Sequence, residues 1–340
     1  MSRKNEAKAP KLIVGWDCGY SNGKLAYGLS TDEEPTLMVR PAQAAPLNQL
    51  HGSMALKPGE YAVEVNGEPW AAFLDPGRAR LNRELHGDYP ATDTYKALFH
   101  AALIAACQEG NVVDHLVTGL PTAQARDAKL VEALTNRLKG THQVAPKRTI
   151  EVREVEVIAQ PVGTLCEINS YHEDADLFAE ANLLVLDPGF FSVDWVMFRR
   201  GDIQRDSSST SLDAMSVVLD SINEEVAMDH GGEGPGRDKI EIALQNNRDT
   251  VLMFGERISL SPYVDRAMGK VAPRALSSLK EQMRFMEGEA LDFILLGGGG
   301  ARFYKDAAQY LFPKAKVIVA DNFVTSNASG YWFNGKNSVI

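Results

Sequence analysis

The sequence predicts an α/β protein with two lobes, and three features of the chain support this fold class. The chain has 340 residues, which suffices for two domains of roughly 100 to 200 residues each. Two apolar strand patterns run into the same Asp-x-Gly turn, once at residues 17–19 and again at 187–189. A run of four glycines, 297–300, follows a third apolar strand. Strands that alternate with helical patterns in this way are typical of α/β folds.

Composition and charge exclude several classes of protein. The formal net charge is −10, which argues against direct, broad DNA binding because phosphate contacts need clustered Lys and Arg. The three cysteines, at 18, 107 and 166, are too far apart for a CxxC zinc motif or a disulfide framework, which favours a reducing compartment. The apolar stretch at 97–107 is too short to span a bilayer, and no secretion signal is visible. We therefore expect a cytoplasmic protein without a membrane partner.

The first lobe is predicted to span residues 11–165, after a disordered tail at 1–10. It opens with a strand, a turn and a return strand over 11–27. The next elements are a helix at 94–108, a strand at 112–117, a helix at 122–139 and a strand at 149–158. Thr92 or Asp93 is the expected N-cap of the first helix. The second helix should carry Leu130, Leu134 and Leu138 on one face.

The second lobe is predicted to span residues 166–321, and 322–340 are expected to return to the first lobe. It opens with another hairpin, in which a strand at 181–186 and a return strand at 195–198 flank the turn. An amphipathic helix follows at 211–228, with its apolar stripe formed by Leu212, Met215, Leu219, Ile222 and Val226. The later elements are a loop at 230–237, a helix at 276–287, strands at 291–296 and 315–319, and a short helix or turn at 322–330.

The two turns carry the main functional signal. Each has an Asp, a Gly two residues later, an aromatic residue and then a hydroxyl residue, and each has a charged residue seven positions after its Asp, Lys24 in the first turn and Asp194 in the second. A tight turn with Gly directs backbone N–H groups into a concavity that binds phosphate oxygens, while the Asp faces the metal that accompanies the phosphates. Either turn alone is also compatible with an ordinary structural turn. Two of them in the same strand context indicate one triphosphate held by both.

The glycine run is a weaker signal. Glycines between a strand and a helix allow the backbone to approach a flat base or a phosphate without a Cβ in the way. A strained strand-to-helix turn explains the run equally well. The run does not match the G-x-G-x-x-G dinucleotide fingerprint, because residues 301–303 break the last spacing.

Together, these motifs resemble the phosphate-1, phosphate-2 and adenosine motifs of the actin, sugar kinase and heat-shock chaperone ATPase superfamily. The motif Asp-x-Gly-Tyr-Ser-Asn-x-Lys at 17–24, the Thr-Gly-Leu-Pro turn at 118–121 and the chain length are most similar to the ParM (StbA) type of plasmid-segregation protein and its archaeal relatives. The resemblance implies a two-domain actin-like fold of duplicated ribonuclease-H-like units with a nucleotide cleft between the lobes. It also implies ATP or GTP with Mg²⁺, and polar filaments that depend on nucleotide hydrolysis.

The resemblance also assigns roles to single residues. Asp17 and Asp187 would lie near Mg²⁺, most simply through water. Gln160 would orient the attacking water, although plasmid-segregation members commonly have Glu there, and Asp187 would be catalytic as well. Phe190 and Phe191 depart from the family pattern, in which Gly and Thr are frequent. The nucleotide-binding residues implied in this way are Gly19, Tyr20, Ser21, Asn22, Lys24, Gly189, Phe190, Phe191, Ser192, Gly297, Gly298, Gly299 and Arg302.

The function expected from this resemblance is that of a slow, Mg²⁺-dependent ATPase, or GTPase, that assembles head to tail and moves or segregates plasmid DNA through a DNA-binding adaptor protein. Two alternatives remain. A small-molecule kinase would need a carboxylate base after the strand at 112–117, and the following turn, 118–122, has no Asp or Glu. A non-filamentous nucleotide switch would open and close its lobes to dock a partner.

Overall fold

The structure, a computed structural model, describes residues 9–51, 55–75, 78, 88–108, 110–282 and 290–339. The chain divides into two compact units. The first unit comprises Met1–Leu120, Asp127–Ile158 and Asn327–Ile340, and the second comprises Pro121–Arg126 and Ala159–Ser326. Most of the expected disordered tail at 1–10 lies outside the described residues.

The first unit is built on a six-stranded sheet with the order β3-β2-β1-β7-β9-β8. Strand β1 pairs antiparallel with β2 and parallel with β7, so the opening hairpin lies inside the sheet and not at its edge. The strands are β1 (Leu12–Cys18), β2 (Asn22–Leu29), β3 (Thr36–Pro41), β7 (Val112–Leu120), β8 (Gly140–Ala145) and β9 (Arg148–Ala159).

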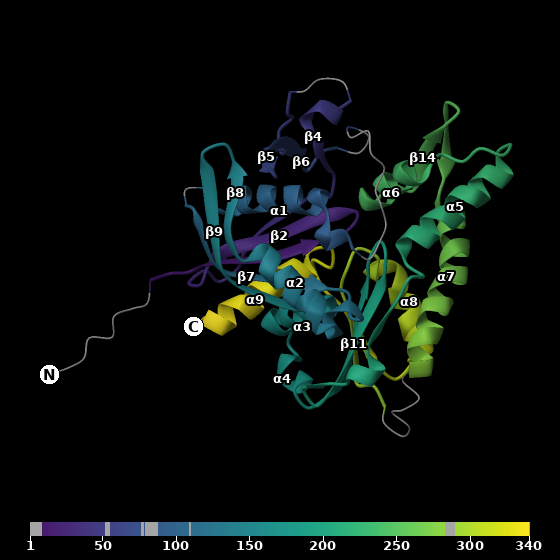
Figure 1. Cartoon of the computed structure of the whole chain (residues 1–340). Coiled ribbons are helices and arrows are strands. Elements are labelled where there is room, and N and C mark those ends of the chain that lie inside the picture. The colour runs from purple at the N-terminus through teal and green to yellow at the C-terminus, as the bar shows by residue number, and fades with distance from the viewer. Residues whose placement is uncertain are drawn as a thin grey trace. The chain divides into compact units, whose positions relative to one another are not determined.

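Helices cover this sheet, and a small second sheet adds a further layer. Helix α1 (Asp93–Ala106) lies between the six-stranded sheet and the three-stranded sheet of β4 (Ala44–Pro46), β6 (Glu68–Ala72) and β5 (Tyr61–Val65) (Figure 1). Helix α9 (Ser326–Val339) packs its Ala328 and Trp332 against Ile13 of β1. Because side chains alternate along a strand, Trp16 points to the other face of β1, where it contacts Phe73.

Of the two helices predicted for the first unit, one begins where expected and the other begins later. Helix α1 begins as expected, with the Thr92 hydroxyl accepting a hydrogen bond from the amide of Tyr95 at 3.1 Å. Helix α2 (Ala128–Leu138) begins six residues later than predicted, because Asp127 is its N-cap and residues 121–126 belong to the second unit. Leu134 and Leu138 are buried, whereas Leu130 is exposed.

The second unit repeats the topology of the first. Its five-stranded sheet has the order β12-β11-β10-β16-β17, which corresponds to β3-β2-β1-β7-β9 of the first unit. Strand β10 pairs antiparallel with β11 and parallel with β16, as β1 does with β2 and β7. The strands are β10 (Asn182–Pro188), β11 (Val193–Arg199), β12 (Asp202–Ile203), β16 (Phe293–Leu296) and β17 (Lys316–Val319), with β13 (Ser209–Ser211) paired to β11. The fold is therefore a two-domain actin-like fold of duplicated α/β units.

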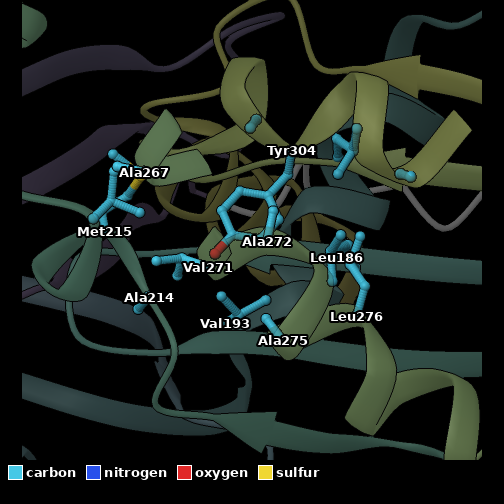
Figure 2. Close-up of a cluster of buried hydrophobic side chains, with 14 of the residues drawn as sticks. Leu186, Val193, Ala214, Met215, Ala267, Val271, Ala272, Ala275, Leu276 and Tyr304 are labelled. Carbon is cyan, nitrogen blue, oxygen red and sulfur yellow. The ribbon is translucent and has the colours of Figure 1, made fainter. Parts of the chain in front are cut away.

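Both faces of the second sheet are buried. Leu184 and Leu186 of β10 face one core, and Leu183 and Val185 face the other, which α3 (Gln160–Tyr171) and α4 (Ala175–Phe178) cover. Figure 2 shows the first of these cores, in which the small side chains of α7 (Ser261–Gln282) and Tyr304 of α8 (Ala301–Leu311) pack towards the strands. The apolar strands of this sheet are continuous rather than alternating because helices lie on both sides.

Several elements of the second unit differ from their predicted bounds. Helix α5 spans Met215–Asp229, so Leu212 lies outside it and is exposed, whereas the other four residues of the predicted stripe are buried. Helix α7 begins 15 residues before the predicted start at 276 and carries Pro273 inside it. The short helix or turn expected at 322–330 is the beginning of the 14-residue helix α9. Helix α6 (Arg237–Gln245) and the hairpin of β14 (Thr250–Met253) and β15 (Glu256–Ser259) were not predicted.

Among the described residues, no helix combines the length and the apolar character that a membrane span requires.

Candidate functional site

The two Asp-x-Gly hairpins have the same register and the same turn hydrogen bond. Asp17 lies opposite Lys24 on the neighbouring strand, and Asp187 lies opposite Asp194 in the same way. In the first turn, the amide of Gly19 donates to the carbonyl of Asn22 at 3.1 Å, and in the second, the amide of Gly189 donates to the carbonyl of Ser192 at 2.8 Å. Each unit therefore presents the same short turn at the carboxyl end of its central strand, where α/β sheets bind ligands.

The first turn is held by an ion pair and an aromatic stack. The carboxylate of Asp17 is buried and accepts a hydrogen bond from the ammonium of Lys24 at 2.8 Å. The ring of Tyr20 stacks on Tyr89, with 4.6 Å between the centroids. The thiol of Cys18 contacts the Tyr89 hydroxyl at 3.8 Å, and burial raises the pKa of this thiol far above its ordinary value. Cys18 is therefore suited to a structural role and not to that of a nucleophile.

The second turn is held by helix α5 and by its own core. The amides of Met215 and Ser216, at the start of α5, donate to the carbonyls of Gly189 and Phe190 at 3.3 and 2.8 Å. The Phe190 side chain packs against the core that α5, α7 and α8 cover. The position where the family pattern frequently has Gly therefore carries an aromatic anchor whose ring packs into this core.

Asp194 is a buried carboxylate with three hydrogen-bond donors around it. Its carboxylate accepts hydrogen bonds from the hydroxyls of Ser192 at 2.5 Å and Thr210 at 2.6 Å, and from the amide of Thr122 at 2.6 Å. Burial raises its pKa, while these three hydrogen bonds act in the opposite direction. The network joins the turn to β13 and to residues 121–126.

The contributions of Thr122 and Thr210 were not anticipated. Asp194 stands out in the sequence only as a charged residue seven positions after Asp187. Thr122 is 72 residues from Asp194 along the chain, and Thr210 is 16 residues away. No local sequence pattern identifies either threonine, because each is brought to Asp194 only by the packing of the second unit.

The glycine run packs directly against the second turn. Gly298 has φ 77°, and a Cβ at this position would overlap the carboxylate of Asp187. A Cβ on Gly300 would lie 2.8 Å from the carbonyl of Pro188, whose oxygen accepts a hydrogen bond from the Gly300 amide at 2.8 Å. Gly299 differs, because beyond its two neighbours in the chain no described residue has an atom within 4 Å of the position that its Cβ would take. The run thus positions Asp187 and leaves open space beside one of its own residues.

Gly297 and Arg302, at the two ends of the predicted adenosine motif, make different contacts. A Cβ on Gly297 would overlap the hydroxyls of Thr164 and Ser326, which hydrogen bond to each other at 2.9 Å. The guanidinium of Arg302 hydrogen bonds to Asn247 and, at 2.7 Å, to the carbonyl of Leu244 at the end of α6. Arg302 therefore connects α8 to α6, and its predicted contact with a nucleotide stays a prediction.

Gln160 lies at a junction between elements. Strand β9 ends at Ala159, and Gln160 is the first residue of α3, followed by Pro161 in the first turn of the helix. Gln160 is partly exposed, in contrast to Thr164 one turn further along, which is buried. The N-terminal end of a helix has a positive electrostatic potential, which attracts anions. The side chain of Gln160 therefore lies where an anion, or a water bound to one, is favoured.

The residues present fit a nucleotide with Mg²⁺ better than a resident metal ion. No cluster of three or more His, Cys, Asp or Glu side chains that could hold a metal occurs among the described residues. Mg²⁺ that arrives with phosphates needs only one or two protein carboxylates, because the phosphates and water supply its other ligands. Asp187, against which Gly298 packs, provides such a carboxylate.

Within each unit, the structure of the described residues brings several of the sequence-predicted site residues together, but it shows no contact of Gln160 or Arg302 with them. In the first unit these are Asp17, the turn at 19–22 and Lys24. In the second unit they are Asp187, the turn at 189–192 and the glycines at 297–299.

Comparison with known proteins identifies the first unit by sequence and the whole chain by fold. Residues 15–163 match the family described as actin like proteins N terminal domain. No protein with a curated description matches the chain by sequence. The archaeal actin homolog Ta0583 superposes with a TM-score of 0.75 at 16% identity, covering 96% of this chain and 100% of that one.

Two filament structures superpose in the same way. A subunit of the 15-stranded ParM filament from Clostridium botulinum matches with a TM-score of 0.73 at 16% identity, covering 96% of this chain and 99% of the other. The Alp12 filament structure matches with a TM-score of 0.66 at 13% identity, with 97% and 99% of the two chains covered. At these identities the likeness establishes the fold.

Proposed function

The chain is an actin-like protein, and from this premise we propose that it binds a nucleoside triphosphate with Mg²⁺ and assembles into filaments. The observation that carries the proposal is the duplicated turn, with the same register and the same Gly amide hydrogen bond in both units. Proteins of the same fold support both parts of the proposal. Ta0583 has been crystallised in complex with ADP, and ParM from Clostridium botulinum and Alp12 form filaments.

In this proposal, the turns at 19–22 and 189–192 bind phosphate oxygens through their backbone amides. Lys24 contributes a positive charge, and its ammonium then divides its hydrogen bonds between the phosphates and its present partner, Asp17. The open space beside Gly299 is where the nucleoside is expected to lie, since the glycine presents no side chain there. Bound Mg²⁺ would neutralise phosphate charge, with Asp187 and Asp17 as its nearest carboxylates through water.

Hydrolysis is assigned to Gln160 and Asp187. A neutral amide offers one acceptor and two donors, so Gln160 can hold a water in line with the terminal phosphate but cannot take up its proton. Phosphoryl transfer depends mainly on positioning and charge stabilisation, so slow turnover is expected. Gln160→Ala should lower turnover about 10- to 100-fold while nucleotide affinity is retained, and Gln160→Glu should remain active. Loss of affinity with an unchanged rate per bound nucleotide would remove Gln160 from the catalytic role.

We also propose that the filament moves or segregates plasmid DNA through an adaptor protein. The net charge of −10 makes direct DNA binding by this chain unfavourable, so a basic adaptor is the better candidate for the DNA contact. In this role the protein would act in the cytoplasm.

Sedimentation and right-angle light scattering test the proposal. The purified chain is incubated at micromolar concentrations with ATP·Mg²⁺, with GTP·Mg²⁺, with either nucleotide and EDTA, or without nucleotide. Pelleting that requires nucleotide and Mg²⁺ supports filament assembly and reports the preferred base. Phosphate transfer that requires a small-molecule acceptor, without pelleting, would indicate the kinase alternative. Nucleotide binding that changes neither scattering nor sedimentation would indicate the switch.

A further inference from the structure

Tyr89 touches the first Asp-x-Gly turn at two points. Its ring stacks on that of Tyr20, with 4.6 Å between the centroids and 26° between the ring planes. Its hydroxyl lies 3.8 Å from the thiol of Cys18, the residue that follows Asp17. Tyr89 itself is buried, so it makes both contacts from inside the first unit.

The same tyrosine is anchored to the beginning of helix α1. Its carbonyl accepts hydrogen bonds from the Thr92 amide at 3.0 Å and from the Thr92 hydroxyl at 2.8 Å. Thr92 is the N-cap of α1, and Tyr95, in the first turn of that helix, packs edge-on against the Tyr89 ring at 5.7 Å. Tyr89 therefore joins the first Asp-x-Gly turn to the N-terminus of α1.

The second unit joins its turn to a helix in a different way. There the first two amides of α5 donate to the carbonyls of Gly189 and Phe190. In both units, the aromatic residue that follows the Gly of the turn thus lies at a link between the turn and a helix. This link runs through the backbone in the second unit, whereas in the first it runs through the side chains of Tyr20 and Tyr89. A single substitution can therefore remove the side-chain link.

We propose that Tyr89 is a positioning residue for nucleotide binding, which acts through its contacts with Tyr20 and Cys18. The inference rests on the proposed function, in which the first turn binds phosphate oxygens through its backbone amides. Contacts at residues 18 and 20 restrain the backbone on both sides of Gly19, and glycine is the most permissive residue type. A turn that is ordered in advance loses less conformational entropy when a ligand binds, so it binds more tightly.

The test compares two substitutions of the same residue. Tyr89→Leu removes the stack and should weaken the binding of ATP·Mg²⁺ or GTP·Mg²⁺, whichever the wild type prefers, by about tenfold. KM should rise by the same factor while kcat stays within about twofold, because the turn binds ground state and transition state alike. Tyr89→Phe keeps the ring and should retain most of the affinity. Titration calorimetry and steady-state phosphate release measure these values.

A double-mutant cycle attributes the effect to the stack. Tyr20→Leu removes the same ring contact from the side of the turn, so Tyr20→Leu combined with Tyr89→Leu should weaken binding no more than either change alone. Fully additive losses would overturn the proposal, because they would mean that the two tyrosines act independently of each other.

Phe333→Leu is the matched control for lost stability. Phe333, on α9 of the same unit, contacts the ring of Trp332 at 5.1 Å. The indole of Trp332 hydrogen bonds to the carbonyl of Gly28, at the opposite end of the opening hairpin from the turn. Phe333→Leu should therefore lower the melting temperature but bind nucleotide like the wild type. Weaker binding by Phe333→Leu, equal to that of Tyr89→Leu, would assign the effect to stability alone.

Hydrogen exchange without nucleotide separates this role from the proposed function. The amides of residues 19–22 should exchange faster in Tyr89→Leu than in the wild type or in Phe333→Leu. Unchanged exchange at these amides would overturn the proposal, whatever the chain binds. A wild type that binds neither nucleotide would reject the proposed function and this role with it. Wild-type affinity in Tyr89→Leu would reject this role alone.

Discussion

Gly298 and Gly299 are neighbours with different physical constraints. Gly298 needs its positive φ, and a Cβ there would overlap the Asp187 carboxylate. Gly299 needs neither, because beyond its two neighbours in the chain no described residue has an atom within 4 Å of its Cβ position. A single run of identical residues thus contains one position that serves the fold and one that faces open space.

This difference predicts opposite results for two alanine variants. Gly298→Ala should lower stability by about 1–2 kcal/mol from the left-handed conformation alone, and should weaken nucleotide binding because Asp187 is displaced. Gly299→Ala should melt like the wild type but bind nucleotide more weakly if the nucleoside lies there. Thermal melting without nucleotide and titration calorimetry with ATP·Mg²⁺ measure the two effects. Equal melting of both variants would contradict the packing argument.

Glu167 on α3 is a buried carboxylate, and one of its oxygens, Oε2, has no hydrogen-bond partner in the described part of the chain. Burial raises its pKa from 4.5 to about 7, a hydrogen bond with Tyr171 opposes this, and the charge of Asp321 adds to it. The folded state therefore holds this proton more tightly than the unfolded state. The stability that the folded state gains from holding this proton is complete below about pH 4.5 and is lost as the pH rises through about 7. The total loss is at most about 3 kcal/mol.

The substitution Glu167→Gln should abolish that pH dependence. Between pH 5 and pH 8, a window of about 3 pH units around the shifted pKa, wild-type stability should fall while that of Glu167→Gln stays flatter. Urea denaturation at each pH measures the difference. Glu132→Gln, which changes an exposed carboxylate on α2, is the control and should follow the wild type. Parallel curves for the wild type and Glu167→Gln would mean that Glu167 is ionised in the folded protein throughout.

At the scale of elements, the segment 121–126 shows most clearly that tertiary contacts decide to which unit a segment belongs. It follows β7 and precedes α2, yet it belongs to the second unit. The amide of Thr122 donates to Asp194, the amide of Ala123 donates to Thr210 at 3.1 Å, and Arg126 hydrogen bonds to the carbonyls of Arg205 and Ser208. The Asp194 network therefore connects this segment to the second Asp-x-Gly turn through Ser192.

Asp194→Asn should loosen this segment. An amide has one acceptor oxygen where the carboxylate has two, so at least one of the three donors loses its partner, at about 1–3 kcal/mol. Hydrogen exchange should speed up at residues 121–126 and at the turn of 189–192. Asp202→Asn, an exposed change on β12 of the same sheet, is the matched control. Wild-type exchange in Asp194→Asn would mean that the segment is held by its other contacts.

At the scale of the whole molecule, the duplicated topology places one Asp-x-Gly turn in each unit. We expect the loss of either carboxylate to impair hydrolysis more than folding. Asp187→Asn keeps the side-chain volume and should lower Mg²⁺-dependent phosphate release by about 100-fold or more. In the proposed function, filament decay depends on hydrolysis, so filaments that still form should then persist longer. Release at the wild-type rate would contradict the phosphate role of the second turn.

The sequence alone determined those parts of the fold that depend on local chemistry. Both hairpins, the N-cap of α1 at Thr92 and the buried stripe of α5 follow from turn residues and from periodicity over a few neighbours. The family resemblance was visible in the sequence for the same reason, because its motifs are short and contiguous. The actin-like fold that it implied is confirmed by the structure and by the comparisons.

Only the tertiary structure decided which long-range partners these motifs acquire. The exposure of Leu130, the late start of α2 and the early start of α7 depend on what packs beside each helix, which periodicity does not encode. The same holds for the site, where Thr122 reaches Asp194 across 72 residues and Gly298 is a glycine because Asp187 lies against it. Such contacts arise from the packing of distant segments, so no window of neighbouring residues contains the information that specifies them.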